Sequence, residues 1–332
     1  MKRRQPEITP DFHKIQKVQH QTARMDSKEQ EEEKKCSEHS IPLSNMFKII
    51  SELGNGRTGR VMSADDIRTA ETVALKLVEK STESSRCIFN ERTAHRYLPP
   101  HKHIADLKQI EEDLEYKRRR YTVFVLQLGI HGTLRDKILC SGHLSETLTR
   151  TYFHQLLQAL KISHSSKVYH MDVKPENLIL DENFNLLLCD WGLSMYCGGE
   201  SIPERRIVGT AQFMAPEIHK CCAYDPSKAD LWSAACVLFS MMTGRPPFSK
   251  ATESDWHFKK MSGKQYKRFW DSHIRHAPWI SEGFVKLINR LLVDNEADRP
   301  TIDEILSDPW MLESTIPDGK IVLEMKKMKK MV

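Results

Sequence analysis

Three polar segments, spread over a chain of 332 residues, constrain this protein more than any other feature. Segment 53–61 reads LGNGRTGRV, segment 169–177 reads YHMDVKPEN, and segment 190–192 reads DWG. Glycines without a Cβ let backbone N–H groups approach a phosphate closely, and carboxylate and amide oxygens are the ligands that Mg²⁺ prefers. We therefore expect the chain to fold so that these distant segments meet around one phosphate-bearing ligand.

The composition favours one large domain inside the cell. A chain of this length can bury a large core, and one two-lobed domain with short tails fits it better than several independent domains. The formal charge of +5 is too small to demand nucleic acid, so no such partner is expected. The eight cysteines show no CxxC spacing and segment 1–14 has no apolar stretch, so we expect a reducing, cytoplasmic location, with access to the nucleus left open.

The character of the sequence changes at two places. Residues 1–44 carry many charges and few apolar side chains, which predicts a disordered tail. Residues 45–313 carry the apolar patterns of a folded domain, which we divide into an N-terminal lobe of 45–129 and a C-terminal lobe of 130–313. Residues 314–332 are interpreted as a basic C-terminal tail.

Strand patterns dominate the predicted N-terminal lobe. Segment 71–78 alternates and is rich in β-branched residues, and segments 104–110 and 121–128 are also strand-like. The charged stretch 111–120 between the last two is interpreted as a solvated hairpin tip. Segment 84–98 contains neither proline nor glycine and has helical spacing, which predicts one helix in this lobe.

Helical patterns dominate the predicted C-terminal lobe. Apolar residues recur at helical spacing over 145–163, and further helices are predicted at 228–243, 281–292 and 301–307. The polar stretch 251–280 has no clear period. The lobe is therefore expected to be mainly α-helical.

Lys76 and an acidic partner form the first candidate catalytic pair. Lys76 ends the run VALK on the strand-like segment 71–78, where its ammonium group can reach nucleotide phosphates if a carboxylate fixes it. Glu91, on the predicted helix, is the expected partner, and Glu83 is the alternative.

The second and third polar segments supply the remaining chemistry. Asp172 is the candidate to accept the proton of a substrate hydroxyl or to orient that hydroxyl, and Lys174 to stabilise the charge of a migrating phosphoryl group. Asn177 supplies a neutral oxygen and Asp190 an anionic oxygen, which suits a magnesium ion that shares its ligands with phosphate.

Together with these residues, four further motifs give the chain a family resemblance. They are Gly209-Thr210, MAPE at 214–217, DLWS at 230–233 and DRP at 298–300. From about Phe47 to Leu312 the chain resembles eukaryotic serine/threonine protein kinases, nearest in character to the calmodulin-dependent and energy-sensing group. The resemblance implies an α+β, two-lobed fold, with a small antiparallel sheet and one helix in the first lobe and a larger, mainly α-helical second lobe.

The resemblance also implies the reaction. ATP would donate its γ-phosphate, with Mg²⁺, to serine or threonine hydroxyls of protein substrates, because DVKPEN at 172–177 is the serine/threonine form of this segment. Thr210 would contact the catalytic Asp172 and Lys174, and the equivalents of Glu217 and Arg299 would form a buried ion pair.

The same resemblance implies a nucleotide pocket and a metal site. Leu126 would be the gatekeeper, and 127–129 would be the hinge that reads adenine. The implied nucleotide-binding residues are Leu53, Gly54, Asn55, Gly56, Arg57, Thr58, Gly59, Val61, Ala74, Lys76, Leu126, Gln127, Leu128, Gly129 and Ile179, and the implied metal ligands are Asn177 and Asp190.

Three residues depart from the family pattern. Met171 replaces the arginine that normally precedes the catalytic aspartate, so we predict that activity does not require a phosphate on the activation segment. Trp191 stands in place of phenylalanine, and His95 stands at a position that is normally apolar. These departures keep a rival hypothesis open, in which the chain is an impaired pseudokinase that binds ATP as a scaffold; a small-molecule or lipid kinase is a third alternative.

The basic tail adds one partner hypothesis. Ile321, Met325, Met328 and Val332 share a helical stripe opposite several lysines, which resembles a calmodulin target or an anionic membrane-surface helix at 320–332. A frayed end without a partner is the alternative. We expect the protein to be a monomer.

Overall fold

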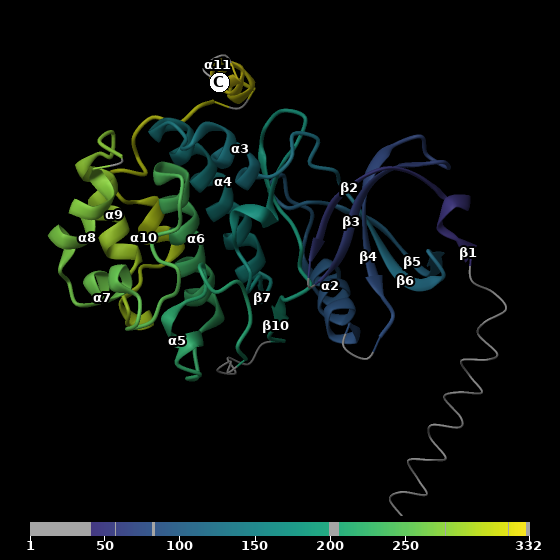
Figure 1. Cartoon of the computed structure of the whole chain (residues 1–332), viewed down its shortest axis with the longest axis horizontal. Helices are drawn as coiled ribbons and strands as arrows, with labels where there is room; N and C mark the ends of the chain where they lie inside the picture. The colour runs from purple at the N-terminus through teal and green to yellow at the C-terminus, as the bar shows by residue number, and fades with distance from the viewer. Residues whose placement is uncertain are drawn as a thin grey trace, which may run out of the picture.

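The computed structural model describes residues 41–56, 58–81, 84–198, 206–275, 277–317 and 319–329. They form two lobes, a β-sheet with one long helix at one end and a larger group of helices at the other (Figure 1). The predicted α+β, two-lobed fold is confirmed. No helix among the described residues has both the length and the apolar character needed to cross a membrane.

One six-stranded sheet makes up most of the N-terminal lobe. Its strands are β1 (Ile41–Pro42), β2 (Phe47–Gly56), β3 (Gly59–Asp66), β4 (Thr72–Glu79), β5 (Leu107–Tyr116) and β6 (Arg119–Leu126), in the order β1-β5-β6-β4-β3-β2. All neighbours are antiparallel except β1 and β5. The central β4 is buried along most of its length. Lys76 is thereby held inside the lobe.

The predicted hairpin tip lies within 111–120, but it is shorter than predicted. β5 continues to Tyr116, and the turn consists of Lys117 and Arg118, both at positive φ. Charged side chains of the strand pair on its solvent side, as Asp113 does with Lys80 at 2.8 Å. A strand that is solvated on one face carries as many charges as a loop, so composition alone could not separate the two.

The packed domain also begins earlier than the predicted boundary at residue 45. Leu43 is 2% exposed and belongs to the same apolar cluster as Phe47, and β1 pairs with the far end of β5. Residues 41–44 therefore belong to the N-terminal lobe, while the remainder of the predicted tail lies outside the described residues.

Helix α2 (Ser85–Tyr97) confirms the predicted helix of this lobe. Its C-terminal end contacts the short strand β10 (Met195–Tyr196), where Tyr97 stacks on Tyr196 with ring centroids 3.8 Å apart. The helix thus connects the two lobes.

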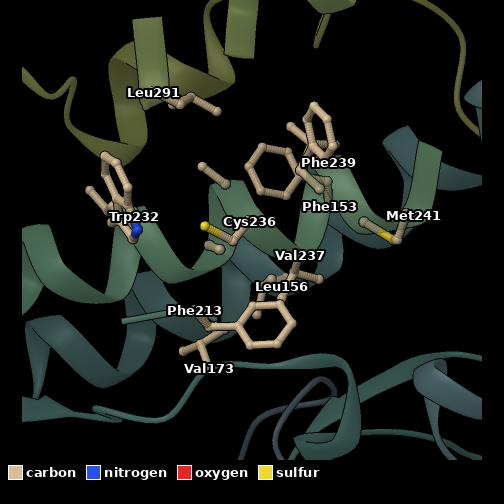
Figure 2. Close-up of a cluster of buried hydrophobic side chains, with 14 of the residues drawn as sticks. Phe153, Leu156, Val173, Phe213, Trp232, Cys236, Val237, Phe239, Met241 and Leu291 are labelled. Atoms are coloured by element: carbon tan, nitrogen blue, oxygen red, sulfur yellow. The ribbon is translucent and has the colours of Figure 1, made fainter. Parts of the chain in front are cut away.

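The C-terminal lobe is built around α4 (Glu146–Ser165) and α6 (Pro226–Thr243), which pack against each other. Figure 2 shows Trp232, Cys236 and Phe239 of α6 within a cluster of buried apolar side chains. Asp225 caps the start of α6, since its side chain accepts a hydrogen bond from Ser227 N, and Gly244 in the left-handed conformation caps its end. Because α6 is covered on nearly every side, its sequence is apolar with little helical periodicity.

The other predicted helices of this lobe are confirmed within two residues at each end: α9 (Glu282–Leu291) and α10 (Ile302–Leu306). The stretch without a clear period contains α7 (Trp256–Ser262) and α8 (Tyr266–Ile274). The remaining elements are α3 (Leu134–Ser141), α5 (Pro216–His219), the 3-10 turns η1 (Leu43–Asn45), η2 (Pro175–Asn177) and η3 (Glu296–Asp298), and the short strands β7 (Val168–Tyr169), β8 (Leu178–Leu180) and β9 (Leu186–Leu188).

The described part of the basic tail predicted at 314–332 packs against the C-terminal lobe. Helix α11 (Ile321–Lys329) lies on the C-terminal lobe with Ile321 and Met325 buried, and Met325 Sδ accepts a hydrogen bond from Tyr152 Oη at 3.8 Å. Ile316 N donates to Thr151 Oγ1 at 2.9 Å. The apolar stripe predicted to bind a partner is therefore partly occupied by the protein itself; Met328 and Val332 lie outside the described side chains.

Candidate active site

A cavity of about 660 Å³ opens between the two lobes. Its roof comes from β2, β3 and β4, and its floor from the segments on either side of β8 and β9. Cavities of this size and mixed polarity are typical of small-molecule sites. The three polar segments that are far apart in the sequence therefore converge on one space.

Every predicted nucleotide-binding residue that the structure describes lines this cavity. They are Leu53, Gly54, Asn55, Gly56, Thr58, Gly59, Val61, Ala74, Lys76, Leu126, Gln127, Leu128, Gly129 and Ile179, joined by Asp172, Lys174, Asn177 and Asp190. Arg57 lies outside the described residues. Ala105, Leu193, Thr133, Arg135, Asp136 and Glu176 also line the wall, and none of them was predicted to bind the nucleotide.

Two glycines allow the backbone to approach closely where the cavity needs it. At Gly59, with φ of +132°, an added Cβ would lie 2.6 Å from Leu77 O. At Gly129 it would lie 2.5 Å from Ile179 Cβ. A side chain at Gly59 would push β3 away from β4, and a side chain at Gly129 would push the hinge away from β8.

Lys76 is buried and lies between two carboxylates. Its Nζ donates to Glu91 Oε2 and, at 2.6 Å, to Asp190 Oδ1. Glu91 is 1% exposed on α2, so the structure places Glu91 against Lys76, and the alternative Glu83 lies outside the described residues. One lysine thus joins β4, α2 and the segment that follows β9.

The charges of this trio are fixed by their proximity. Burial favours the neutral form of each group, but the attraction between them outweighs it. The pKa of the Lys76 ammonium is raised by Asp190 and Glu91, and the pKa of Glu91 is lowered by Lys76. Lys76 and a hydrogen bond from Thr58 lower the pKa of Asp190 to about 2. Asp190 is therefore ionised at neutral pH, as a magnesium ligand must be.

Asp172 lies in a compact network at the cavity floor. Its Oδ2 accepts from Lys174 Nζ at 2.6 Å and its Oδ1 from Thr210 Oγ1 at 2.8 Å, while Lys174 Nζ also donates to Thr210 Oγ1 at 2.9 Å. The implied contacts of Thr210 with the two charged residues are confirmed. Asn177 Nδ2 donates to Asp172 O at 2.9 Å, which leaves the amide oxygen of Asn177 to act as a ligand.

Buried Asp230 of α6 holds the backbone that presents Asp172. Its carboxylate accepts from His170 N and Met171 N, both at 2.8 Å, and contacts His164 Nε2 at 2.9 Å. Met171 adopts a left-handed φ of 65°, which costs energy for a residue with a side chain. The bonds to Asp230 keep this turn in place.

The donor set fits a magnesium nucleotide. Asp190 and Asn177 supply one anionic and one neutral oxygen on the cavity wall, Lys76 supplies a cation, and Gly54 and Gly56 have open space where a Cβ would lie. Asp190 and Asn177 would hold the cation; in the structure, Lys76 and Thr58 donate to the two oxygens of Asp190.

Comparison with known proteins places this geometry in a family. The model of the protein kinase domain matches residues 47–311. CBL-interacting protein kinase 10 of Oryza sativa subsp. japonica is 32% identical over 293 residues, covering 84% of this chain and 61% of that protein. CBL-interacting serine/threonine-protein kinase 26 of Arabidopsis thaliana is 33% identical over 277 residues, covering 82% of this chain and 60% of that protein. CBL-interacting serine/threonine-protein kinase 7 of Arabidopsis thaliana is 34% identical over 283 residues, covering 82% of this chain and 61% of that protein.

These relatives confirm the resemblance to eukaryotic serine/threonine protein kinases. The chain spans about three fifths of the length of the curated relatives that it matches. The family match itself covers most of the chain, from Phe47 at the start of β2 to Met311. The chain therefore belongs to the protein kinase domain family.

Proposed function

We propose that the protein is an ATP-dependent serine/threonine kinase that transfers the γ-phosphate of ATP to hydroxyl groups of protein substrates. The convergence of Lys76, Asp172, Asn177 and Asp190 on one cavity carries this proposal. Lys76 and the backbone of the glycine segment bind the phosphates, and the hinge 127–129 binds the adenine edge. Glu91 holds Lys76 in place.

The protein's own residues position the reaction. Asp172 orients the substrate hydroxyl and accepts its proton, Thr210 holds Asp172, and Lys174 stabilises the negative charge on the transferred group. Asp190 and Asn177 would hold Mg²⁺, which when bound neutralises charge on the phosphate oxygens. The low pKa of Asp190 keeps that ligand ionised throughout the neutral range.

A labelling experiment tests the proposal. Purified protein is incubated with Mg²⁺, γ-labelled ATP and mixed protein substrates, and the labelled amino acids are identified after acid hydrolysis. We expect label on serine and threonine. Nucleotide binding without any transfer would instead support the rival scaffold, and label on tyrosine alone or on small molecules would contradict the proposed substrate class.

Activity is expected to survive removal of phosphate from the activation segment. Met171 is 5% exposed and cannot pair with a phosphate as an arginine would. Ser194 is buried, Tyr196 is already stacked on Tyr97, and Ser201 lies outside the described residues. We expect phosphatase-treated and untreated protein to have the same kcat within about twofold; a fall of tenfold or more after treatment would contradict this prediction.

Partners and location are proposed from the sequence. Contact of 320–332 with calmodulin or an anionic membrane requires α11 to leave the lobe, because Ile321 and Met325 are buried. Titration of Ca²⁺-calmodulin onto the whole protein, with and without Ca²⁺, tests the first option. A cytoplasmic, monomeric protein without a nucleic-acid partner remains our proposal from charge and cysteine usage.

A further inference from the structure

Three buried polar atoms, on residues that belong to the Lys76–Glu91–Asp190 trio or neighbour it, lack a hydrogen bond within the described part of the chain. They are Glu91 Oε1, His95 Nε2 and Trp191 Nε1. A buried polar atom without a partner is costly and calls for an explanation. Glu91 belongs to the trio, His95 contacts Glu91, and Trp191 follows Asp190 in the sequence. His95 and Trp191 are also residues that depart from the family pattern.

Two of these atoms face each other. His95 Nε2 lies 3.7 Å from Glu91 Oε1, and the two side chains are 8% and 1% exposed. The residues are four apart on α2, so they occupy the same face on consecutive turns. The separation is slightly longer than a hydrogen bond and too short for a water molecule to bridge in good geometry.

The two oxygens of Glu91 therefore have different roles. Oε2 accepts from Lys76, whereas Oε1 has His95 Nε2 as its polar neighbour. A carboxylate that is held through one oxygen can still rotate about its last side-chain bond. A donor on the second oxygen would fix the plane of the group, and with it the position of the Lys76 ammonium.

We propose that His95 is a positioning residue for phosphoryl transfer: its Nε2–H donates to Glu91 Oε1 and fixes the carboxylate that holds Lys76. The proposal rests on the proposed kinase function. An apolar side chain at this position could fill the space but could not make the bond. His95 touches neither substrate nor nucleotide, and it acts only through Glu91.

The protonation of the His95 ring provides a test that does not depend on activity. In protein labelled with ¹⁵N-histidine, the signals of His95 are assigned from their absence in a His95→Leu variant. We expect a proton on Nε2, in either the neutral or the cationic ring. A neutral ring with its proton on Nδ1 would place two acceptors face to face and would overturn the proposal.

Kinetics and nucleotide binding test the consequence. We expect His95→Leu to raise the KM for ATP about tenfold. The dissociation constant of a fluorescent ATP analogue, bound with Mg²⁺, should rise by the same factor, because the loss of a hydrogen bond to a charged group weakens binding by about this much. His95→Gln keeps an N–H donor and should remain within about threefold of the wild type. Rescue by glutamine but not by leucine separates the hydrogen bond from mere packing.

Arg96→Leu is the matched control, because Arg96 is the next residue on α2 and is exposed. It should leave both constants unchanged. Equal constants for wild type and His95→Leu, or equal losses for leucine and glutamine in folded protein, would overturn the proposal. If the wild type transfers no phosphate at all, the kinase proposal fails, while the ring protonation and the binding measurements still decide the role of His95.

Discussion

Replacing Asp172 with asparagine is expected to lower kcat for phosphoryl transfer about 10³-fold, within the range assigned to a positioned general base. The change removes the negative charge and the ability to accept a proton while it preserves the size of the side chain. Asp172 is 6% exposed, and Lys174 and Thr210 hold its two oxygens, so no other carboxylate of the network can take its place. Initial rates with labelled ATP measure the effect.

The binding of nucleotide should change far less than the rate. Lys76, Asp190 and the glycine segment form a separate group of contacts above Asp172, so the dissociation constant of a fluorescent ATP analogue should stay within about threefold of the wild type. Glu182→Gln is a suitable control, because Glu182 is exposed and outside the cavity. A variant that keeps more than a tenth of the wild-type rate would show that Asp172 is not the acceptor.

The catalytic residues could be predicted from the sequence because their chemistry leaves few alternatives. Carboxylates suit both proton acceptance and magnesium binding, and Asp172 and Asp190 stand in segments that are typical of these two roles. Lys76 could be found because it is the single lysine within the apolar run VALKLV of this strand. The carboxylate partner of Lys76 was harder to identify, because Glu83 and Glu91 both precede the next strand. The packing of α2, which brings Glu91 to Lys76, decides between the two.

Other features could not be predicted because the same sequence suits two environments. The charged half of β5 has the composition of a loop, and only its pairing with β6 makes it a strand. The stripe of α11 is apolar enough for a partner, and the C-terminal lobe supplies the surface that buries Ile321 and Met325. The bond from Thr58 to Asp190 joins residues that are 132 apart in sequence, and no local pattern encodes it.

The ion pair between Glu217 and Arg299 is expected to have the largest effect on stability. Glu217, in α5, accepts two hydrogen bonds of 2.6 Å from Arg299, which is 2% exposed and also lies over the Trp232 ring at 4.9 Å. Glu217→Ala leaves a buried guanidinium without its counter-charge, so we expect the free energy of unfolding to fall by about 3 to 5 kcal/mol. Denaturant titration followed by circular dichroism measures this change.

Arg299→Ala should cost at least as much as Glu217→Ala, because Arg299 also donates to the carbonyls of Val293, Lys228 and Asp294. Arg299→Ala removes these three part-buried bonds and also leaves Glu217 without its counter-charge, whereas the guanidinium left by Glu217→Ala retains the three carbonyls and the Trp232 ring. The exposed pair Lys286–Glu282 is the control: it has a similar length of 2.7 Å, but exposed ion pairs contribute little, so Glu282→Ala should change stability by less than about 1 kcal/mol. If Glu217→Ala lowers the free energy of unfolding no more than Glu282→Ala does, the buried ion pair does not stabilise the C-terminal lobe.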